Sequence, residues 1–481
     1  MINSKKKIDL ILIILLLFFT IFIRAYNIGY DDLWFDEISS YWVSDPRISI
    51  NESLIRHNRI EKTPLLYFLI LKINFNLFFY DSLSGRYLSL IFNILGIIFS
   101  VLTCKTLSNN KSYILALFIF ASNIYLINYA QEMRVYSLMF FLSSLYLYLF
   151  IKINKFVKTE ELNFLYLILI SSSLVLMLIS HPFCFLVFFS VVIYLIVEFF
   201  RKNKISKTLR YNIFFGVIFS IAYLFFLSGK IDQSPSWISQ PNLKFYTNFY
   251  FSKFFGSRLL GLLHLVLFLC LIVYMYQRIF KKNSNLDIFL ILTFLCYFLP
   301  IIFGYLIKPI ILPRYIIFIL IPIVILLSIL VFEINNIYIR NSIITFLIII
   351  NVGNHFFEAT FQQFFKERPF YKTNFKKMLN TLKNEDTKLY TINLPRLKDG
   401  NDHYYTAIEN YISSLRVSTY DAVEYIEREK ILKSNDKKIW IICLMTIVTD
   451  KCENVRFNSS DIILKEKPVP GMRMVLISRN L

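Results

Sequence analysis

Two adjacent carboxylates, Asp36 and Glu37, lie in the segment Leu33-Trp34-Phe35-Asp36-Glu37, directly after the first apolar segment of the chain. Placing charged acidic side chains close to a bilayer costs free energy, and such residues often mark a functional site. If the segment is helical, the two side chains point about 100° apart, so we do not expect both to act on one atom. One of them would be a general base and the other would position a neighbour, an acceptor or a metal. Solvated loop acids, or an acidic helix start, are the alternative.

Cationic residues near the ends of apolar segments form a second group with possible chemistry: Arg86, Arg134, Arg314 and Lys308. A guanidinium group offers forked donors to phosphate oxygens. A base for an acceptor hydroxyl, combined with positive charge for a leaving phosphate, is the set of groups that glycosyl transfer from a phosphate-linked lipid requires. Snorkelling or local pairing is the structural alternative for each arginine.

Other motifs are weaker or absent. His181 precedes a proline in a turn between two apolar segments, where a capped turn histidine is the alternative to a base or ligand. Asp36, Glu37 and Glu132 could hold a divalent cation, but no dense carboxylate motif requires one. The sequence has no glycine-rich phosphate loop, HExxH motif, nucleophile elbow or CxxC pair, so hydrolase, kinase and redox functions lack their motifs.

These residues must be positioned by a membrane protein, because 56% of the 481 residues are hydrophobic and only 17% are charged. The formal net charge of +20 comes from short basic clusters between apolar segments, a pattern that indicates membrane orientation and not nucleic-acid binding. About eleven segments are long enough to cross a bilayer. They lie near 8–24, 85–104, 112–129, 135–151, 163–180, 182–200, 211–228, 258–279, 286–306, 314–333 and 338–353.

The basic clusters predict the orientation of these segments. With Lys5 to Lys7 in the cytoplasm and the first apolar segment kept as an uncleaved span, five later clusters also fall on the cytoplasmic side. They are Lys105/Lys111, Lys152/Lys155/Lys158, Arg201/Lys202/Lys204/Lys207/Arg210, Arg278/Lys281/Lys282 and Arg340. The apolar stretch from Pro64 to Tyr80 is then interfacial or re-entrant, because counting it as a span would reverse every later cluster. The loops 25–86, 131–134, 180–182, 229–257 and 308–314 share the external side with the tail.

The tail turns polar and alternates helix-like with strand-like stretches, which predicts a small α/β domain. These stretches are 375–383, 388–394, 404–415, 422–432, 437–445 and 472–478. We therefore expect two domains: a transmembrane domain over 1–353 that contains the external loop 25–86, and an extracytoplasmic α/β domain over 354–481. Cys443 and Cys452 are spaced so that they could form a disulfide, whereas the other four cysteines lie in or beside apolar segments.

Several motifs in order along the chain resemble the bacterial family 39 glycosyltransferases, relatives of protein O-mannosyltransferases and of the aminoarabinose transferase that modifies lipid A. They are Arg24-Ala25-Tyr26-Asn27-Ile28-Gly29, LWFDE at 33–37, Pro64-Leu65-Leu66-Tyr67, Gly85-Arg86, YAQEMRVYSL at 129–138, Ser180-His181-Pro182-Phe183 and Pro313-Arg314-Tyr315. The resemblance implies a GT-C fold and polyprenyl-phosphate sugar donors outside the cytoplasmic membrane of a bacterium. It also implies that Asp36 is the catalytic base. The site would be lined by Glu37, Arg86, Gln131, Glu132, Arg134, Tyr136 and His181.

The chain departs from the family where His-Pro-Pro-Leu-Tyr is usual, since it reads Thr63-Pro64-Leu65-Leu66-Tyr67. The predicted function is an inverting transfer of one sugar from a polyprenyl phosphate to an external lipid, glycan or protein acceptor. Two alternatives remain. A transporter or flippase of lipid-linked sugars would show broken helices in matching halves and ionisable residues at mid-membrane depth. A glycan ligase or polymerase would transfer a preassembled chain.

Overall fold

The computed structural model describes residues 4–60, 64–108, 110–157, 160–201, 204–231, 238, 240, 252–255, 258–275, 284–357, 372–393, 402–416, 423–426, 428–431, 436–444, 461–469 and 471–479. The chain divides into two compact units. The first contains Met1–Tyr26, Lys62–Tyr67 and Arg86–Arg368, and the second contains Asn27–Glu61, Phe68–Gly85 and Pro369–Leu481. The boundary that we predict near residue 354 stays a prediction, but the second unit also includes most of the first external loop.

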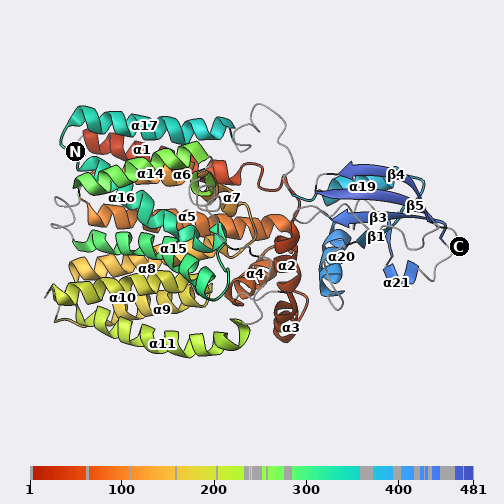
Figure 1. Cartoon of the computed structure of the whole chain (residues 1–481), viewed down its shortest axis with the longest axis horizontal. Coiled ribbons are helices and arrows are strands. Elements are labelled where there is room, and N and C mark those ends of the chain that lie inside the picture. The colour runs from red at the N-terminus through yellow and green to blue at the C-terminus, as the bar shows by residue number, and fades with distance from the viewer. Residues whose placement is uncertain are drawn as a thin grey trace. The chain divides into compact units, whose positions relative to one another are not determined.

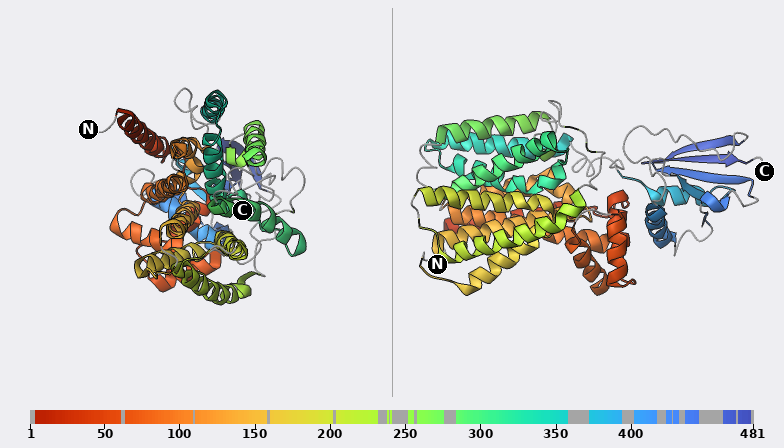
Figure 2. Two further views of the ribbon diagram at one scale, coloured as in Figure 1. Left: turned by 90° about the vertical axis from the view of Figure 1, so that its left-hand side faces the viewer. Right: turned by 60° about the horizontal axis from the view of Figure 1, so that its bottom comes forward.

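The first unit is a bundle of apolar helices that run side by side (Figures 1 and 2). The helices are α1 (Ser4–Ala25), α5 (Ser82–Leu107), α6 (Ser112–Ser122), α7 (Ile124–Ala130), α8 (Tyr136–Phe156), α9 (Phe164–Leu178), α10 (Phe185–Phe200), α11 (Lys207–Ile231), α14 (Arg258–Met275), α15 (Asp287–Leu306), α16 (Leu320–Phe332) and α17 (Ile337–Phe357). Short helical turns precede four of them: η1 (Pro182–Cys184), α13 (Ser252–Phe255), η3 (Ser284–Leu286) and η4 (Pro313–Ile319).

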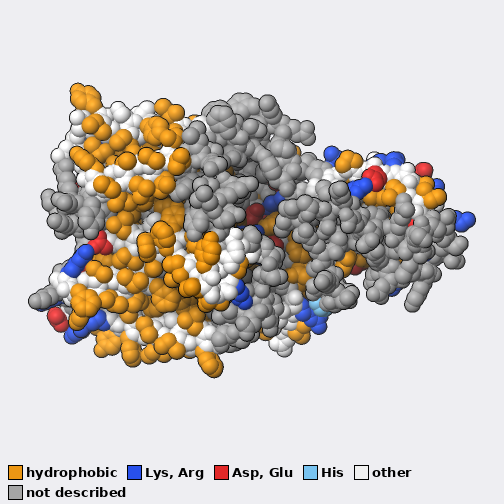
Figure 3. Space-filling view, in the orientation of Figure 1, with side chains coloured by type: hydrophobic (Ala, Val, Ile, Leu, Met, Phe, Trp, Pro, Cys, Tyr) orange, Lys and Arg blue, Asp and Glu red, His pale blue; other side chains and the backbone are white. Residues whose placement is uncertain are grey.

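The bundle is a multi-pass membrane domain. Among the described residues, 7 helices are long and apolar enough to cross a bilayer, and an eighth span results if the bent pair α6 and α7 is counted as one. Three shorter apolar helices, α9, α14 and α17, coincide with the other expected crossings, which stay a prediction. Side chains such as Phe18 and Phe225 are 68% and 84% exposed. Figure 3 shows hydrophobic side chains over the face of the bundle that it presents, which suits contact with lipid.

One end of the bundle collects charged contacts between consecutive loops. The Lys111 ammonium lies 2.6 Å from Asp9 Oδ1, and Arg201 Nη1 lies 2.6 Å from Asp287 Oδ2. Lys155 Nζ donates to the Thr106 carbonyl at 2.6 Å. The start of α1 and the loops after α5, α8 and α10 therefore meet at one end, as the basic clusters predict. Lys158, Lys202, Arg278, Lys281 and Lys282 of those clusters lie outside the described residues.

In the second unit, the external loop forms three helices: α2 (Phe35–Val43), α3 (Ile50–Ile60) and α4 (Leu66–Leu77). At about 1.5 Å per residue, the 12 residues of α4 rise roughly 18 Å, whereas the hydrocarbon core is about 30 Å thick. Helix α4 is therefore too short to cross a bilayer, consistent with the interfacial or re-entrant segment that we predict for 64–80.

The C-terminal part of this unit is a 5-stranded mixed sheet with the order β2-β1-β3-β5-β4. Its strands are β1 (Leu389–Asn393), β2 (Glu424–Tyr425), β3 (Lys438–Leu444), β4 (Ile462–Val469) and β5 (Met472–Ser478), and its helices are α19 (Phe375–Lys383), α20 (Asp402–Arg416) and α21 (Arg428–Ile431). Strand β1 pairs in parallel with β2 and β3, whereas β5 is antiparallel to β3 and β4. A buried cluster on β3 and β5, including Ile441 and Val475, forms the core. The predicted α/β structure of the C-terminal part is confirmed.

Two further features hold this domain together. Cys443 on β3 is disulfide-bonded, and the Cys452 that we expect as its partner lies outside the described residues. Gly471 turns the chain between β4 and β5 with a φ of +72°, and a Cβ there would lie 2.7 Å from Thr373 Cα. The position therefore requires glycine, because only glycine permits both this backbone angle and so close an approach.

Candidate functional site

The acidic segment begins helix α2. Trp34 is extended, with φ −88° and ψ 172°, and its carbonyl accepts the first helical hydrogen bond from Ile38 N at 2.9 Å. Asp36 and Glu37 occupy the first turn, where the positive end of the helix favours carboxylates. Glu37 Oε2 also accepts a hydrogen bond from Trp34 N at 3.5 Å. Both predicted catalytic acids are therefore placed on one helical turn.

The two acids have different surroundings, as their helical spacing predicts. The Glu37 side chain is completely buried, and its Oε2 lies 2.8 Å from Lys372 Nζ. Lys372 also lies over the Trp34 ring, 6.0 Å from its centroid. Asp36 is only half-buried. Asp36 is thus the acid that an incoming molecule could reach, and Glu37 is held inside the unit by a cation.

Two more acids precede this turn and were not among the predicted site residues. Asp31 and Asp32 are 7% and 3% exposed. Asp32 Oδ2 accepts the backbone N–H of Lys376 at 2.8 Å, and its Oδ1 lies 3.4 Å from Lys376 Nζ. The signal was present in the sequence, because an Asp-Asp pair directly precedes LWFDE.

Helix α20 packs against the same segment. The Phe35 and Tyr404 rings stack with centroids 4.7 Å apart, and Leu33 N donates to the Tyr411 hydroxyl at 3.3 Å. Tyr404 in turn donates to the Ile60 carbonyl at the end of α3, at 3.2 Å. Residues of α20 therefore contact the segment directly before Asp36 and the end of α3.

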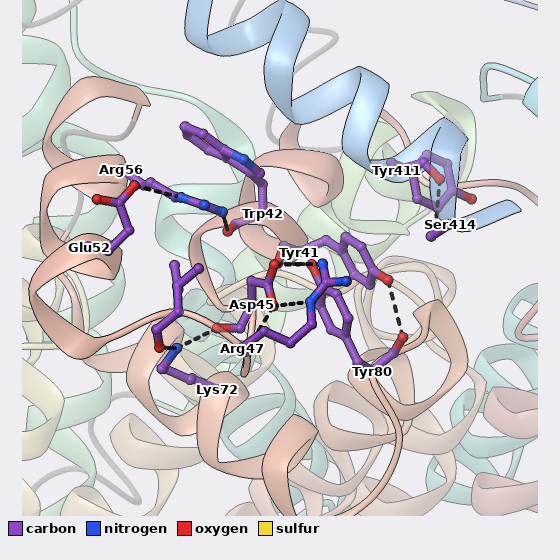
Figure 4. Close-up of polar contacts among 11 residues, drawn as sticks. Tyr41, Trp42, Asp45, Arg47, Glu52, Arg56, Lys72, Tyr80, Tyr411 and Ser414 are labelled. Atoms are coloured by element: carbon purple, nitrogen blue, oxygen red, sulfur yellow. Dashed lines mark hydrogen bonds and ion pairs between the residues drawn. The ribbon is translucent and has the colours of Figure 1, made fainter. Parts of the chain in front are cut away.

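A polar network supports the other end of α2 (Figure 4). Arg47 donates to both Asp45 oxygens, at 2.9 and 2.7 Å, and Lys72 Nζ donates to the carbonyls of Asp45 and Ile48. Burial disfavours the charged form of Asp45, but the hydrogen bonds from Arg47 outweigh it and hold the pKa of Asp45 below its usual value. Tyr41 and Tyr80 stack at 4.0 Å. Each of the two donates its hydroxyl to the other's carbonyl. These contacts are structural.

In the bundle, the structure brings Arg134, Arg314 and His181 together. Arg134 is 5% exposed and lies in the turn between α7 and α8. Burial, and then the positive charges of Arg134 and Arg314, lower the pKa of His181 to about 3. The imidazole is therefore neutral at physiological pH. Because its Nδ1 accepts the Phe183 N–H at 3.3 Å, the proton of the neutral ring is on Nε2, which makes Nε2 a hydrogen-bond donor.

Aromatic rings surround this cluster. The Arg314 guanidinium lies 5.8 Å from the Tyr136 ring and 5.9 Å from the Tyr315 ring, within cation–π range. The Tyr315 ring lies 5.0 Å from His181, and Tyr136 lies 5.1 Å from Tyr129. Tyr136 was a predicted site residue, whereas Tyr129 and Tyr315 were only part of the motifs. Of the predicted site residues of the bundle, Arg134, Arg314, His181 and Tyr136 thus belong to one group of cations and aromatic rings.

A buried arginine, Arg24, holds the end of α6, the helix that precedes α7. Helices α6 and α7 bend by 58° at their junction, so carbonyls at the end of α6 lose their helical donors. Arg24 donates to the Phe120 and Ala121 carbonyls at 2.9 Å each, and to Asn93 Oδ1 at 2.8 Å. His355 Nε2 lies 2.6 Å from the Ser122 carbonyl. Arg24 was quoted only as part of a motif, and its structural role was not predicted.

Other predicted residues lie on nearby elements. Gln131 donates through Nε2 to the carbonyls of Arg24 and Tyr26, at 3.0 Å each, so its amide joins α1 to the turn after α7. Arg86 is 1% exposed in α5 and lies on the same helical face as Asn93, two turns away. Glu132 and Lys308 are half-buried.

The predicted acids and the predicted phosphate-binding cations belong to different compact units. The chain joins them directly, however, because Asp36 follows Tyr26 by ten residues and Arg86 follows Gly85. Within the described residues, no three His, Cys, Asp or Glu side chains are grouped so that they could hold a metal ion.

No protein-family model and no curated protein sequence matches the chain. Solved structures do. ArnT from Cupriavidus metallidurans without ligand matches with a TM-score of 0.61 at 11% identity, and the match covers 98% of both chains. The same protein bound to undecaprenyl phosphate gives 0.57 at 10% identity, again over 98% of both chains. The archaeal oligosaccharyltransferase AglB from Archaeoglobus fulgidus, in complex with an inhibitory peptide and a dolichol-phosphate, gives 0.55 at 11% identity over 91% of this chain and 69% of AglB. The chain therefore has an ArnT-like fold.

Proposed function

We propose that the protein is a membrane glycosyltransferase that moves one sugar from a polyprenyl-phosphate donor to an acceptor outside the cytoplasmic membrane of a bacterium. The observation that carries this proposal is the group that Arg134, Arg314 and His181 form with the Tyr136 and Tyr315 rings, in a membrane bundle with an ArnT-like fold. Two guanidinium groups and an N–H donor suit a phosphate better than a neutral ligand. The structures of ArnT with undecaprenyl phosphate and of AglB with dolichol-phosphate support a ligand of this class.

In the proposed reaction, Asp36 accepts the proton of an acceptor hydroxyl. The oxygen attacks the anomeric carbon from the side opposite the phosphate, and the bond between that carbon and the phosphate oxygen breaks. The phosphate leaves with the electron pair, and Arg134 and Arg314 stabilise its negative charge, with Arg86 and Lys308 as further cations. A single displacement of this kind inverts the anomeric centre.

The extracytoplasmic placement of the active site and of the C-terminal domain is part of the proposal. It is supported by the basic residues that meet at the opposite end of the bundle. The cysteines support it too. Cys443, in the C-terminal domain, is disulfide-bonded, whereas Cys104, Cys184, Cys270 and Cys296 of the bundle are free thiols. Structural disulfides are typical of oxidising compartments outside the cytoplasm.

The test is transfer by the purified protein in lipid vesicles supplied with a panel of polyprenyl-phosphate monosaccharides. We expect Asp36→Asn to lower turnover by about 10²- to 10⁴-fold, because the amide keeps the shape but does not accept the proton. Asp81→Asn is the matched control, since Asp81 is an exposed acid that caps α5 by accepting Ser84 N at 2.7 Å. Asparagine also caps helices. Normal turnover by Asp36→Asn would remove Asp36 from the reaction.

The same assay separates the alternatives. A transferase releases free polyprenyl phosphate and adds the mass of one sugar to the acceptor. Movement of intact donor across the vesicle without release would indicate a transporter, and addition of many sugars at once would indicate a ligase or polymerase.

A further inference from the structure

We propose that Lys372 of the C-terminal domain is a positioning residue for the reaction, which acts by keeping Glu37 ionised and thereby fixing the helical turn that carries Asp36. This inference rests on the proposed function. It gives the C-terminal domain a part in positioning the general base, through one ion pair between residues 335 positions apart in sequence.

The first step of the argument concerns burial. The Glu37 side chain has an exposed fraction of 0%, and that of Lys372 is 16%. A buried carboxylate remains charged only if a cation or several donors compensate for the lost water. Lys372 Nζ, 2.8 Å from Glu37 Oε2, provides that compensation.

The second step concerns what the charge does. Glu37 Oε2 accepts the N–H of Trp34, the residue immediately before α2. An ionised carboxylate at this position also interacts favourably with the positive end of the helix. Protonation of Glu37 would weaken both interactions. Asp36 precedes Glu37 directly, so a looser first turn changes the direction of the general base.

The third step concerns how Lys372 is itself held. Its neighbour Thr373 contacts the Gly471 turn so closely that no Cβ fits there. Two residues further on, the Phe375 ring lies 5.7 Å from Tyr411, whose hydroxyl accepts Leu33 N. The sheet and α20 therefore hold the backbone that follows Lys372 and the backbone that precedes Glu37.

The test compares Lys372→Met with Lys376→Met. Both remove an ammonium group from the same segment, but Lys376 has a side chain that is 52% exposed and lies 3.4 Å from Asp32. Asp32 is buried, but after the substitution it keeps the backbone hydrogen bond from Lys376 N at 2.8 Å, so this variant removes only the ammonium contact at 3.4 Å. We expect Lys372→Met to lower kcat at pH 7 by about 10- to 100-fold with little change in the donor KM, because the base is displaced but the phosphate site is intact. Lys376→Met should stay near wild type.

The pH profile is the decisive readout. Without Lys372, the buried Glu37 binds a proton at higher pH, so the acidic limb of the kcat profile should move up by about one to three pH units. Activity should then recover as the pH rises. A purely structural role would lower kcat at every pH and leave the limb in place, and that result would overturn the proposal.

Two further variants keep the proposal falsifiable if Lys372→Met folds poorly. Lys372→Arg restores the charge and should recover most of kcat. Glu37→Gln/Lys372→Met removes both charges of the pair, and its kcat should equal that of Glu37→Gln alone if Lys372 acts through Glu37. A double variant that is clearly worse than Glu37→Gln would contradict the proposal.

Hydrogen exchange distinguishes failure of this inference from failure of the proposed function. If the wild type transfers no sugar from any donor, the proposed function fails. The coupling of Lys372 to α2 can still be measured in that case. We expect amide exchange over residues 35–39 to be faster than in wild type in Lys372→Met and unchanged in Lys376→Met. Equal exchange in the two variants would overturn the coupling whether or not the protein is a transferase.

Discussion

The two ends of the helical bundle both carry cations but hold them in different ways. At the basic end, the Lys111 and Arg201 side chains are 54% and 45% exposed and form ion pairs with acids from neighbouring loops. At the opposite end, Arg24 and Arg134 are 0% and 5% exposed. Exposed cations are stabilised by water, whereas buried cations must be stabilised by the protein or by a ligand. Burial therefore distinguishes the end that carries the candidate site better than the number of charges does.

The strongest test of this comparison is Arg24→Met. It leaves Asn93 Oδ1 and the carbonyls of Phe120 and Ala121 without the donor seen here. Unsatisfied buried acceptors cost about 1–3 kcal/mol each, so we expect the free energy of unfolding to fall by about 3 kcal/mol or more. Thermal unfolding of the purified protein in detergent measures this loss.

Arg24→Lys should give an intermediate result, because one ammonium group cannot reach all of these acceptors. If Arg24→Met unfolds at the wild-type temperature but loses donor binding, the interpretation of Arg24 as structural is wrong.

The next largest effect should come from Arg314→Ala and Arg134→Ala. Loss of one donor to a developing negative charge typically lowers the rate by about 10²- to 10³-fold, and we expect kcat/KM for the donor to fall by that factor. The kcat/KM of Arg314→Lys should lie between those of the wild type and Arg314→Ala, since a point charge does not reproduce the fork of donors. Kinetics at varied donor concentration, with thermal stability measured in parallel, provide the data.

Arg340 is the matched control for Arg314. Its guanidinium lies 5.8 Å from the Phe332 ring, the same distance that separates Arg314 from the Tyr136 ring, and it is predicted to lie on the cytoplasmic side. Arg340→Ala should therefore leave donor kinetics unchanged. Equal losses in the two variants would mean that a cation over an aromatic ring is needed only for folding.

The smallest effect should come from Lys111→Ala. Its ion pair with Asp9 is largely exposed, and such pairs contribute about 0–1 kcal/mol. We expect unfolding temperature and transfer to stay close to wild type. A loss as large as that of Arg24→Met would show that the two ends do not differ in the way that their burial suggests.

Much of the fold was predictable because hydropathy is a local property. The apolar segments, the short helix at 66–77 and the α/β tail all follow from residues near in sequence. The bend between α6 and α7 differs from the single span that hydropathy predicts over 112–129, because hydropathy does not register the helix break at Asn123. Asn123 caps α7 by accepting Leu126 N at 3.0 Å. Strand β4 was missed too, because its Lys465, Glu466, Lys467 and Pro468 suit an edge strand but lack the expected alternation.

The site was predictable only in part. Charged residues at the ends of apolar segments indicated Arg134 and Arg314, and the bundle brings them to His181. The partner of Glu37 was not predictable, because no local pattern distinguishes Lys372 from the other lysines of the tail. That pairing arises only when residues 27–61 and 369–481 fold into one unit.

The second unit is built from segments far apart in the sequence, and this has a consequence for folding during synthesis. Glu37 leaves the ribosome long before Lys372, which lies 335 residues later. At about 5–20 residues per second, translation takes roughly 20 to 70 seconds to cover that interval. During this interval the loop lacks the Lys372 ammonium that pairs with its buried Glu37. A nascent chain is therefore a membrane protein before it has a formed acidic turn, and chaperones or proteases would encounter this loop before its ion pair has formed.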